Sequence, residues 1–498
     1  MNKPESTPAD AMNRSHIGAE ELIDDRRAEG IFRVHRSAFL DPGIFELEMS
    51  KVFESTWVFI GLESQVARPH DFITSHIGRQ PIILTRTAGG TLGCFLNSCR
   101  HRGMLLCPFS GGNQKFHVCR YHGWVYDSSG RNAGITDQQE GQYPDSFASG
   151  DHDLVPVARL ESYRGFVFAS LSPNVPGLRE HLGGAHVFLD IVADQAPNGL
   201  EYVAGAIDYT FDANWKLQFE NGLDFYHFAS THSSYVDILN RRIQPSATPG
   251  PTSSAVKQES ALTGQGTFSF PRGHSVMWST LRPGQAQHAA GDVGDAPSPA
   301  AEGDEGVRRK WRMRQRNLTI FPNLQIIDIQ SMKLSLQLRT WQPLAADKTR
   351  MSSHCLAPVG EARGERRSRI RAYEDFFNPS GLATSDDNVM YEFCQSGFRA
   401  IAAGPTQGYL RGLGELQTNG MEHAAELNID DCESAFGSMT FGNETCFHAG
   451  YREWQRLLLA EDSRSSVIVH SPRAAGQATA VERPVVDDAV ATGLRKSP

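Results

Sequence analysis

The sequence predicts an α+β protein in which two parts of different character follow each other. Between about residues 60 and 170, short hydrophobic runs alternate with Gly, Pro, Asn and Asp, which is typical of a small antiparallel β domain. From about residue 201 to residue 460, longer strand-like runs are mixed with helical stretches, which favours a second domain built from a sheet and helices. The chain has 498 residues, which is enough for two or more domains.

The N-terminal region precedes both domains. Residues 1–17 are mostly polar and have no periodic pattern, so we expect a disordered arm. Residues 18–57 carry apolar side chains at helical spacing, and Asp41-Pro42 predicts the start of a helix. We expect these N-terminal helices to pack on the second domain.

We place the first domain at residues 58–172 and the second at residues 173–462. Strands of the first domain are expected in the runs PIILTR, HVCRYHGWVY and RGFVFASL. In the second domain we expect helices at 176–200, 214–232, 371–377 and 452–462, and long strands at 201–211 and 331–344. Residues 282–307 are rich in Gly, Ala, Pro and Asp, which predicts a mobile loop, and residues 463–498 are expected to form a disordered tail.

Charge and hydropathy exclude several classes of protein. The net charge is −9 and no basic run stands out, which argues against nucleic-acid binding. No stretch of eighteen apolar residues predicts a membrane span, and the N-terminus lacks the apolar region of a secretory signal. We therefore expect a cytoplasmic protein, in which eight cysteines more often bind metal than form disulfides.

Two cysteine–histidine pairs lie close together in the first domain. Cys99 is followed by His101, and Cys119 is followed by His122. These side chains could be incidental core residues, ligands of a structural zinc ion, or ligands of a Rieske [2Fe–2S] centre. Zinc sites usually pair cysteine with cysteine and histidine with histidine, whereas each pair here offers one thiolate and one imidazole.

This pairing favours the Rieske centre, in which two cysteines hold one iron and two histidines hold the other. Two facing loops would supply the ligands, and the glycines around them would permit tight turns: Gly103, Gly111, Gly112 and Gly123. Trp124 would cover the cluster with apolar surface. Cys94 and Cys107 fit neither loop, so we interpret them as buried structural thiols.

A second cluster lies at the start of the second domain. Asp224, His227 and Glu220 share a helix face, but His232 follows His227 by five residues and points about 140° away on a regular helix. Both imidazoles can therefore bind one metal only if the helix distorts or ends nearby, and Gly222 agrees with strain there. Two histidines and a carboxylate form the facial triad of non-haem Fe(II) oxygenases, while an isolated pair of this spacing is more often unconnected with metal.

The carboxylate must come from elsewhere in the chain. Asp386 and Asp387 follow a glycine-containing turn and begin a predicted helix. Their ordinary role there would be helix capping. The residues alone leave open which of the two, if either, completes the triad.

Residues from about 30 to 460 resemble the large (α) subunit of Rieske non-haem iron aromatic-ring-hydroxylating dioxygenases. The motifs that carry this are CRHRG, CRYHGW, SYRGFVFASL, NWKLQFENGLDFYH, NLTIFPNLQIID and FFNPSGLATSDD with CQSG. Within the family the chain is most similar to the benzoate, toluate, anthranilate and 2-halobenzoate 1,2-dioxygenase group. The resemblance implies a catalytic domain with a large antiparallel sheet covered by helices, of helix-grip type.

The resemblance also assigns residues and partners. It implies that Asp387 is the third iron ligand, with Asp386 as the fallback, and that the enzyme is a homotrimer of α chains or an α3β3 assembly with a small β subunit. Asp224 would then bridge His122 of one chain to His227 of the next and carry electrons between them. Electrons would come from NADH through a separate reductase, with or without a ferredoxin.

The expected reaction is cis-dihydroxylation of an aromatic carboxylate by O2, giving a cis-diol or, after loss of CO2 and an ortho substituent, a catechol. Arg339 is a candidate partner for the substrate carboxylate, although an exposed strand arginine is an equal alternative, and Arg241 and Arg242 are weaker candidates. A salicylate-type monohydroxylase or a terephthalate-type dioxygenase would use the same metals. An electron carrier or a zinc protein is the alternative from a different class.

Overall fold

The computed structural model describes residues 17–461, apart from residues 197, 206, 244–261, 282–312, 329–335, 416–420 and 437–441. The predicted loop at 282–307, the predicted tail at 463–498 and residues 1–16 of the predicted arm lie outside the described residues. The strands that are described form five sheets, and all their pairings are antiparallel. Together with the helices, they confirm the predicted α+β class.

The N-terminal segment contains a hairpin as well as helices. The prediction of helices alone in residues 18–57 is wrong, because β1 (Ile23–Arg26) and β2 (Ile31–Val34) pair around Gly30, whose φ of 70° suits a tight turn. Helix α1 (Pro42–Leu47) begins as predicted, since the Asp41 carboxylate accepts a hydrogen bond of 2.7 Å from the Gly43 amide. A π-helix (Glu48–Phe53) follows it.

A buried ion pair ties this segment to the large domain. Glu48 pairs with Lys216 and accepts hydrogen bonds from the indole N–H groups of Trp215 (3.0 Å) and Trp454 (2.8 Å). Both charged side chains are 1% exposed. Removing one partner would leave a buried charge uncompensated, which typically costs about 3–5 kcal/mol. The N-terminal segment is therefore part of the core that supports the catalytic elements.

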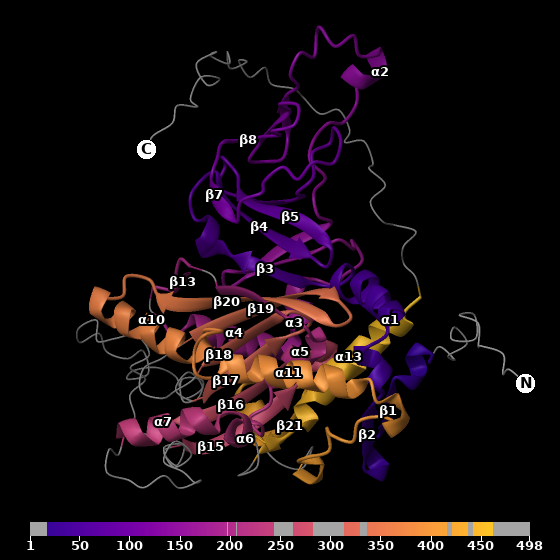
Figure 1. Ribbon diagram of the computed structural model, residues 1–498. Helices are drawn as coiled ribbons and strands as arrows, with labels where there is room; N and C mark the ends of the chain where they lie inside the picture. The colour runs from indigo at the N-terminus through magenta and orange to yellow at the C-terminus, as the bar shows by residue number, and fades with distance from the viewer. Residues whose placement is uncertain are drawn as a thin grey trace, which may run out of the picture.

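The first domain consists of three small sheets. Their strands are β3 (Val58–Leu62), β4 (Asp71–Ile77), β5 (Gln80–Arg86), β6 (Leu92–Leu96), β7 (Gly111–Asn113), β8 (Phe116–Val118), β9 (Val125–Asp127), β10 (Asn132–Gly134), β11 (Arg159–Tyr163) and β12 (Phe166–Ser170). They are arranged in the orders β6-β5-β4-β7, β10-β9-β8 and β11-β12-β3. The run 117–126 is a hairpin and not one strand, because residues 119–124 form the turn between β8 and β9. A short helix, α2 (Asp145–Ala148), lies at the outer end of the domain (Figure 1).

The second domain is built on a nine-stranded sheet. Its order is β13-β20-β19-β18-β17-β16-β15-β21, and β14 also pairs with β20. The strands are β13 (Leu200–Tyr202), β14 (Ile207–Phe211), β15 (Leu262–Ser269), β16 (Ser275–Leu281), β17 (Met313–Ile320), β18 (Leu324–Asp328), β19 (Leu336–Ala345), β20 (Lys348–Pro358) and β21 (Glu433–Phe436). The predicted strand 201–211 is divided into β13 and β14, which pair in succession with β20.

Helices cover both faces of this sheet (Figure 1). They are α3 (Leu178–Leu182), α4 (His186–Ala193), α5 (Trp215–Asn221), α6 (Phe228–Thr231), α7 (Ser233–Ile243), α10 (Arg363–Phe377), α11 (Thr384–Phe398), α12 (Met421–Glu426) and α13 (His448–Leu459). Along β19, Leu336 and Leu338 share a core with α4, whereas Trp341 shares a different core with α5 and α13. Because side chains alternate along a strand, the odd-numbered residues of β19 face the helices that carry the catalytic candidates.

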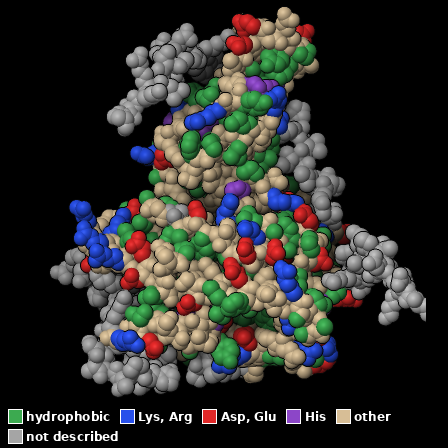
Figure 2. All heavy atoms as spheres, in the orientation of Figure 1, with side chains coloured by type: hydrophobic (Ala, Val, Ile, Leu, Met, Phe, Trp, Pro, Cys, Tyr) green, Lys and Arg blue, Asp and Glu red, His purple; other side chains and the backbone are tan. Residues whose placement is uncertain are grey.

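The space-filling view shows a narrow upper part, which is the first domain, above a wider base (Figure 2). Hydrophobic and basic side chains are mixed over the upper part. None of the helices in the described ranges is long and apolar enough to cross a membrane.

Candidate metal centres

The two cysteine–histidine pairs lie on two loops with matching backbone hydrogen bonds. In the loop after β6, the Cys99 amide donates to the Met104 carbonyl (2.9 Å) and the Gly103 amide donates to the Cys99 carbonyl (2.9 Å). In the loop after β8, Cys119 and Gly123 repeat this pattern. Both glycines have φ near 70°, a conformation that other residues adopt only with strain. The sequence therefore builds the same ligand-presenting turn twice.

The thiols and the imidazoles occupy different depths. Cys99 and Cys119 are 3% and 2% exposed, whereas His101 and His122 are only half-buried and their rings lie 4.4 Å apart. Trp124 stacks on His101 at 5.1 Å, so its ring lies against one of the two imidazoles. Gly111 and Gly112 have a different role from the predicted one, because they form β7 and pair with β4.

The spacing of these four residues fits a two-iron cluster better than a single zinc ion. Zinc bonds of about 2.0–2.3 Å keep all ligand atoms within about 4.6 Å of one another. Among the described residues, no three of these four offer ligand atoms within 4.8 Å of each other. Two thiols inside and two imidazoles outside match a cluster in which each iron has its own pair of ligands.

Other polar groups surround the thiols. The Tyr126 hydroxyl lies 3.4 Å from the Cys99 sulfur and accepts a hydrogen bond of 3.0 Å from the Arg100 amide, so its own proton is free to point at the sulfur. Cys107 is buried, with its sulfur 3.1 Å from Nδ1 of His117, and burial raises the pKa of its thiol to about 12. It is the structural thiol that the sequence predicts, as is the buried Cys94.

The second cluster forms because a helix ends. Helix α5 stops at Asn221, with Gly222 as its C-cap, and His227 is the N-cap of the next short helix, α6. Helix α6 in turn ends at Thr231, and its C-cap His232 has non-helical dihedral angles (φ −102°, ψ 32°), so the predicted end of a helix near the two histidines is present. Gly222 itself is not strained, because its φ of −68° is ordinary. The glycine is required because a Cβ would lie about 1.8 Å from the Gln325 amide.

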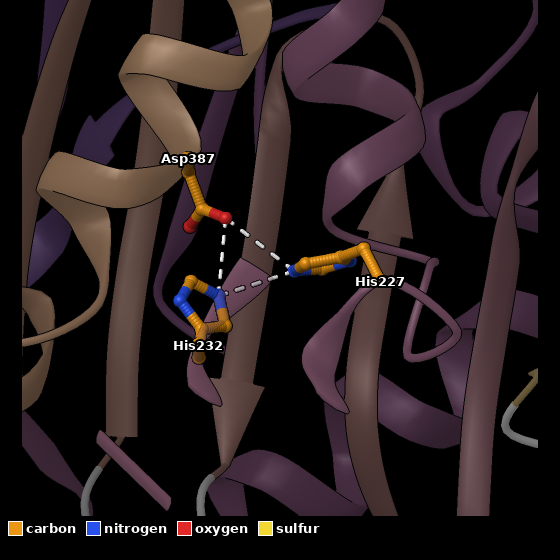
Figure 3. Close-up of side chains that lie close together, drawn as sticks. All are labelled: His227, His232 and Asp387. Carbon is orange, nitrogen blue, oxygen red and sulfur yellow. Dashed lines mark hydrogen bonds and ion pairs between the residues drawn. The ribbon is translucent and has the colours of Figure 1, made fainter. Parts of the chain in front are cut away.

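Three side chains converge beyond this break (Figure 3). Nε2 of His227 and Nε2 of His232 lie 3.2 Å apart, and Oδ1 of Asp387 lies 3.4 Å and 3.1 Å from them. In the described part of the chain, this is the one group of three His, Cys, Asp or Glu side chains whose ligand atoms all lie within 4.8 Å. Two imidazoles and one carboxylate are the donor set of a non-haem iron site.

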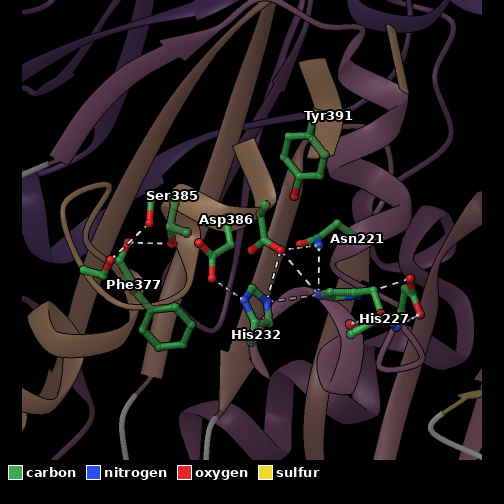
Figure 4. A network of polar contacts seen from close by, with 12 residues as sticks. Asn221, His227, His232, Phe377, Ser385, Asp386 and Tyr391 are labelled. Atoms are coloured by element: carbon green, nitrogen blue, oxygen red, sulfur yellow. Dashed lines mark hydrogen bonds and ion pairs between the residues drawn. The ribbon is translucent and has the colours of Figure 1, made fainter. Parts of the chain in front are cut away.

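Each histidine also has a carboxylate at its outer nitrogen (Figure 4). Nδ1 of His227 lies 3.2 Å from Asp224, and Nδ1 of His232 lies 3.5 Å from Asp386. Carboxylates at this position hold the ring of a metal-binding histidine in place and increase its basicity. The sequence predicts this position for Asp224 but not for Asp386.

The electrostatics of the triad suit a cation. Burial lowers the pKa of His227, but Asp224 and Asp387 outweigh it and raise that pKa to about 9. Burial also opposes ionisation of Asp387, yet its contacts with His227 and His232 hold the pKa of this carboxyl well below its usual range. Asn221 donates to Asp387 (3.1 Å), which supports the carboxylate further. The carboxylates at and beside the three ligands therefore favour a bound cation.

The remaining predictions concern helix capping by the two aspartates of α11 and the exposure of three arginines. Asp386 and Asp387 do not cap α11, because the N-cap is Ala383 and no side chain caps it. Arg339 is 3% exposed, so the alternative of an exposed strand arginine is wrong. Arg241 is exposed on α7, and the side chain of Arg242 lies outside the described part.

Glu220 does not belong to the site. Because α5 ends at Asn221, its carboxylate turns into the core and accepts hydrogen bonds from Tyr409 (2.8 Å) and Tyr451. The prediction that it shares a helix face with Asp224 and His227 is wrong for the same reason.

Comparison with protein families agrees with this geometry. The catalytic domain of the ring-hydroxylating α subunit matches residues 200–460. A Rieske [2Fe–2S] domain matches residues 56–159. The chain belongs to the ring-hydroxylating α-subunit family. It is an oxidoreductase of the Rieske non-haem iron type, with a [2Fe–2S] cluster and a mononuclear iron as cofactors, as predicted.

Individual relatives support the same conclusion. The α subunit of toluate 1,2-dioxygenase from Pseudomonas putida is 37% identical over 457 residues, which cover 89% of this chain and 95% of that protein. The large subunit of 2-halobenzoate 1,2-dioxygenase from Burkholderia cepacia is 39% identical over 388 residues, covering 76% and 80%. The predicted similarity to this group of dioxygenases is confirmed.

The fold is that of a solved relative. A crystal structure of naphthalene 1,2-dioxygenase from Rhodococcus with bound indole has a TM-score of 0.69 and 26% identity, covering 86% of this chain and 95% of that one. The predicted combination of a Rieske domain and a catalytic domain with a helix-covered antiparallel sheet is therefore confirmed. The toluate and 2-halobenzoate relatives are both named as subunits, so family members work within larger assemblies.

Proposed function

We propose that this chain is the terminal oxygenase subunit that cis-dihydroxylates an aromatic carboxylate at C1 and C2. The main support for this proposal is that the ligand atoms of His227, His232 and Asp387 converge on one point. The names of the two relatives, which act on toluate and on 2-halobenzoate, support the choice of an aromatic acid. In the balanced reaction, the ring gains both atoms of O2, and NADH with one proton supplies the two electrons and the two protons.

The residues of the two centres would bind different cofactors. Cys99 and Cys119 would hold the inner iron of the cluster, and His101 and His122 the outer one. His227, His232 and Asp387 would hold the catalytic iron. When bound, the cluster carries single electrons and the catalytic iron activates O2. The chain itself fixes the ligand geometry and orients each histidine from behind.

The shape of the molecule supports electron transfer between chains. The Rieske loops adjoin β7 and β8 in the upper part, whereas α6, which follows His227, lies near the bottom (Figure 1). Direct transfer within one chain would have to cross the whole base. A neighbouring copy can instead place its half-buried His122 beside Asp224, whose carboxylate is 24% exposed. Asp224 then bridges the two centres in a trimer of α chains, with or without β subunits.

Exposed apolar residues around the Rieske loops support such a contact. Met104, Leu105 and Tyr121 are 36%, 43% and 54% exposed, and they flank the two histidines in the sequence. Apolar groups gathered at one end of a domain usually mark an interaction site. Either the neighbouring chain or an NADH-dependent reductase, with or without a ferredoxin, would cover them during electron transfer.

The reaction is tested with the purified oxygenase, an NADH-dependent reductase and a series of benzoates. We expect O2 uptake coupled to NADH oxidation, and a cis-diol that contains two oxygen atoms from 18O2. An acid with an ortho halogen or amino group should give a catechol and CO2. A product with one oxygen atom from 18O2 would identify a monohydroxylase and refute the proposal.

The bridge is tested with hybrid oligomers. Cys99→Ser removes the cluster and Asp387→Ala removes the catalytic iron, so each variant alone should be inactive. Co-expression should restore part of the activity, because an intact cluster in one chain then serves an intact iron in the next. Asp224→Asn in the chain with the intact iron should abolish that recovery while both metals remain bound. Failure of the hybrids to recover would refute transfer between chains.

A further inference from the structure

Arg339 is a buried cation that has no anionic partner among the residues that the structure describes. Its side chain is 3% exposed, and its Nε is buried with no hydrogen-bond partner. Its one side-chain hydrogen bond runs from Nη2 to the Thr384 hydroxyl, at a long 3.5 Å. No carboxylate in the described part of the chain lies within 4.0 Å of the guanidinium. Buried charges in proteins are normally paired, so this arginine can accept an anion that the described residues do not supply.

The guanidinium lies on the catalytic face of the sheet. In the register of β18, β19 and β20, Arg339 is opposite Gln325 on one side and Ser353 on the other, so the three side chains share a face. Gln325 donates to the Phe219 carbonyl of α5 (3.0 Å), and the Ser353 hydroxyl lies 2.6 Å from the Tyr373 hydroxyl of α10. Arg339 therefore points toward the helices that precede both sets of triad residues.

Arg339 is also close to the candidate iron site. Thr384, its hydrogen-bond partner, is the first residue of α11, and Asp387 follows three residues later, about 4.5 Å further along the helix axis. Burial chiefly raises the pKa of Tyr391, the charge on Asp387 adds to this effect, and the charge on Arg339 opposes it. Both charges thus act on the same ring, which lies beside the triad in Figure 4.

An aromatic ring lies next to the cation. The guanidinium carbon is 5.6 Å from the centre of the Phe377 ring, and Phe377 ends α10. The neighbouring Phe376 connects this ring to the triad, since its centre lies 4.9 Å from that of Phe377 and 6.3 Å from that of His232; Figure 4 labels Phe377 and His232. A cation beside an aromatic wall suits a ligand with a carboxylate at one end and an apolar ring at the other.

We propose that Arg339 binds the carboxylate of the aromatic substrate and thereby determines that the enzyme accepts acids. This inference rests on the proposed function. Oxygen addition at C1 and C2 places the reacting carbons directly beside the carboxylate, so its anchor must lie close to the iron. Arg339 meets this requirement, and its planar fork can donate two parallel hydrogen bonds to a carboxylate.

The test compares Arg339→Met with Arg369→Met. Arg369 is also buried, at 5% exposed, but it is paired with Glu361 through a hydrogen bond of 2.9 Å from its Nε. Binding of benzoate and of its neutral analogue benzamide is measured anaerobically by calorimetry on the iron-loaded enzyme. Iron content, the visible spectrum of the cluster and the melting temperature are recorded for each variant.

Arg339→Met should raise the Kd of benzoate about 10- to 150-fold, which is the effect of losing hydrogen bonds to a charged group, and should leave benzamide binding within about 3-fold. Because it removes a buried charge without an anionic partner among the described residues, Arg339→Met should melt no lower than wild type. Arg369→Met should melt lower, because the buried Glu361 then keeps only its longer contact with Arg366 (3.7 Å). Arg339→Lys should recover part of the benzoate affinity.

Two results would overturn the inference. If Arg339→Met binds benzoate as wild type does, the carboxylate is held elsewhere and the proposed function is unaffected. If wild type binds benzamide and benzoate equally well, and oxygenates neutral aromatics but no acid, the proposed function fails and the inference fails with it.

Discussion

Glu220 should make the stability of the catalytic domain depend on pH. Its carboxyl is buried in the same core as the last turn of α5 and accepts hydrogen bonds from Tyr409 and Tyr451. Burial raises its pKa from an ordinary 4.5 to about 7, although both tyrosines favour the ionised form and lower it. Asp224 adds to the rise through its charge and Lys216 opposes it.

The magnitude follows from the two pKa values. Between pH 4.5 and pH 7 the folded chain retains a proton on Glu220 that the unfolded chain has lost, so stability decreases as pH rises through this range. The difference of 2.5 pK units corresponds to about 3 kcal/mol in total. From pH 5.5 to pH 8.5, the decrease should be about 2 kcal/mol. Glu220→Gln keeps an oxygen for the tyrosine hydroxyls but cannot ionise, so it should remove this part of the dependence.

The assay is urea denaturation of wild type and Glu220→Gln at several pH values, followed by tryptophan fluorescence. Trp215 and Trp454 lie in the core that unfolds with α5, so they report on this region. The stability of the glutamine variant relative to wild type should increase by about 2 kcal/mol between pH 5.5 and pH 8.5. Tyr451→Phe, which removes one donor, should move the transition to higher pH. A difference between wild type and Glu220→Gln that stays constant with pH would refute the reasoning.

Three further predictions concern the metal centres. Asp387→Ala should lose the catalytic iron and all oxygenation while the purified protein keeps its red-brown cluster, and iron analysis with visible spectroscopy checks this; an active variant would exclude Asp387 as a ligand. Asp386→Ala should weaken iron binding about 10- to 100-fold, because the outer nitrogen of His232 then loses its carboxylate partner. Competition with a chelator measures the iron affinity, and an unchanged affinity would show that the contact is incidental. Tyr126→Phe should lower the reduction potential of the cluster, because a hydrogen bond to the Cys99 sulfur stabilises the reduced, more negative state. Redox titration followed by EPR measures this potential, and a value equal to or above that of wild type would contradict the prediction.

The parts of the site that the sequence predicts are those encoded over short distances. Cys99 and Cys119 each begin a turn that ends four residues later at a glycine. The ligands and the turns that hold them are therefore encoded in the same short stretches of sequence. The end of the helix at His232 also follows from helical periodicity, once both histidines are assigned to one metal. Glu220 is placed wrongly because the end of α5 depends on Gln325, which fills the space beside Gly222 from a strand about a hundred residues away. No local pattern contains that contact.

The choice between Asp386 and Asp387 likewise depends on packing at the far end of the same helix. Consecutive helical residues point about 100° apart, so only one of the two can reach the inner nitrogens, Nε2 of both histidines. Asp387 shares its face of α11 with the buried Tyr391 and Gln395, and Gln395 donates to the Phe39 carbonyl (2.9 Å) and accepts from the Asn214 amide (3.0 Å). Turning Asp386 inward would rotate these two side chains out of the core. The packing of α11 on the N-terminal segment therefore fixes Asp387 as the inner carboxylate and Asp386 as the outer one, so Asp386 should not replace the lost ligand in Asp387→Ala.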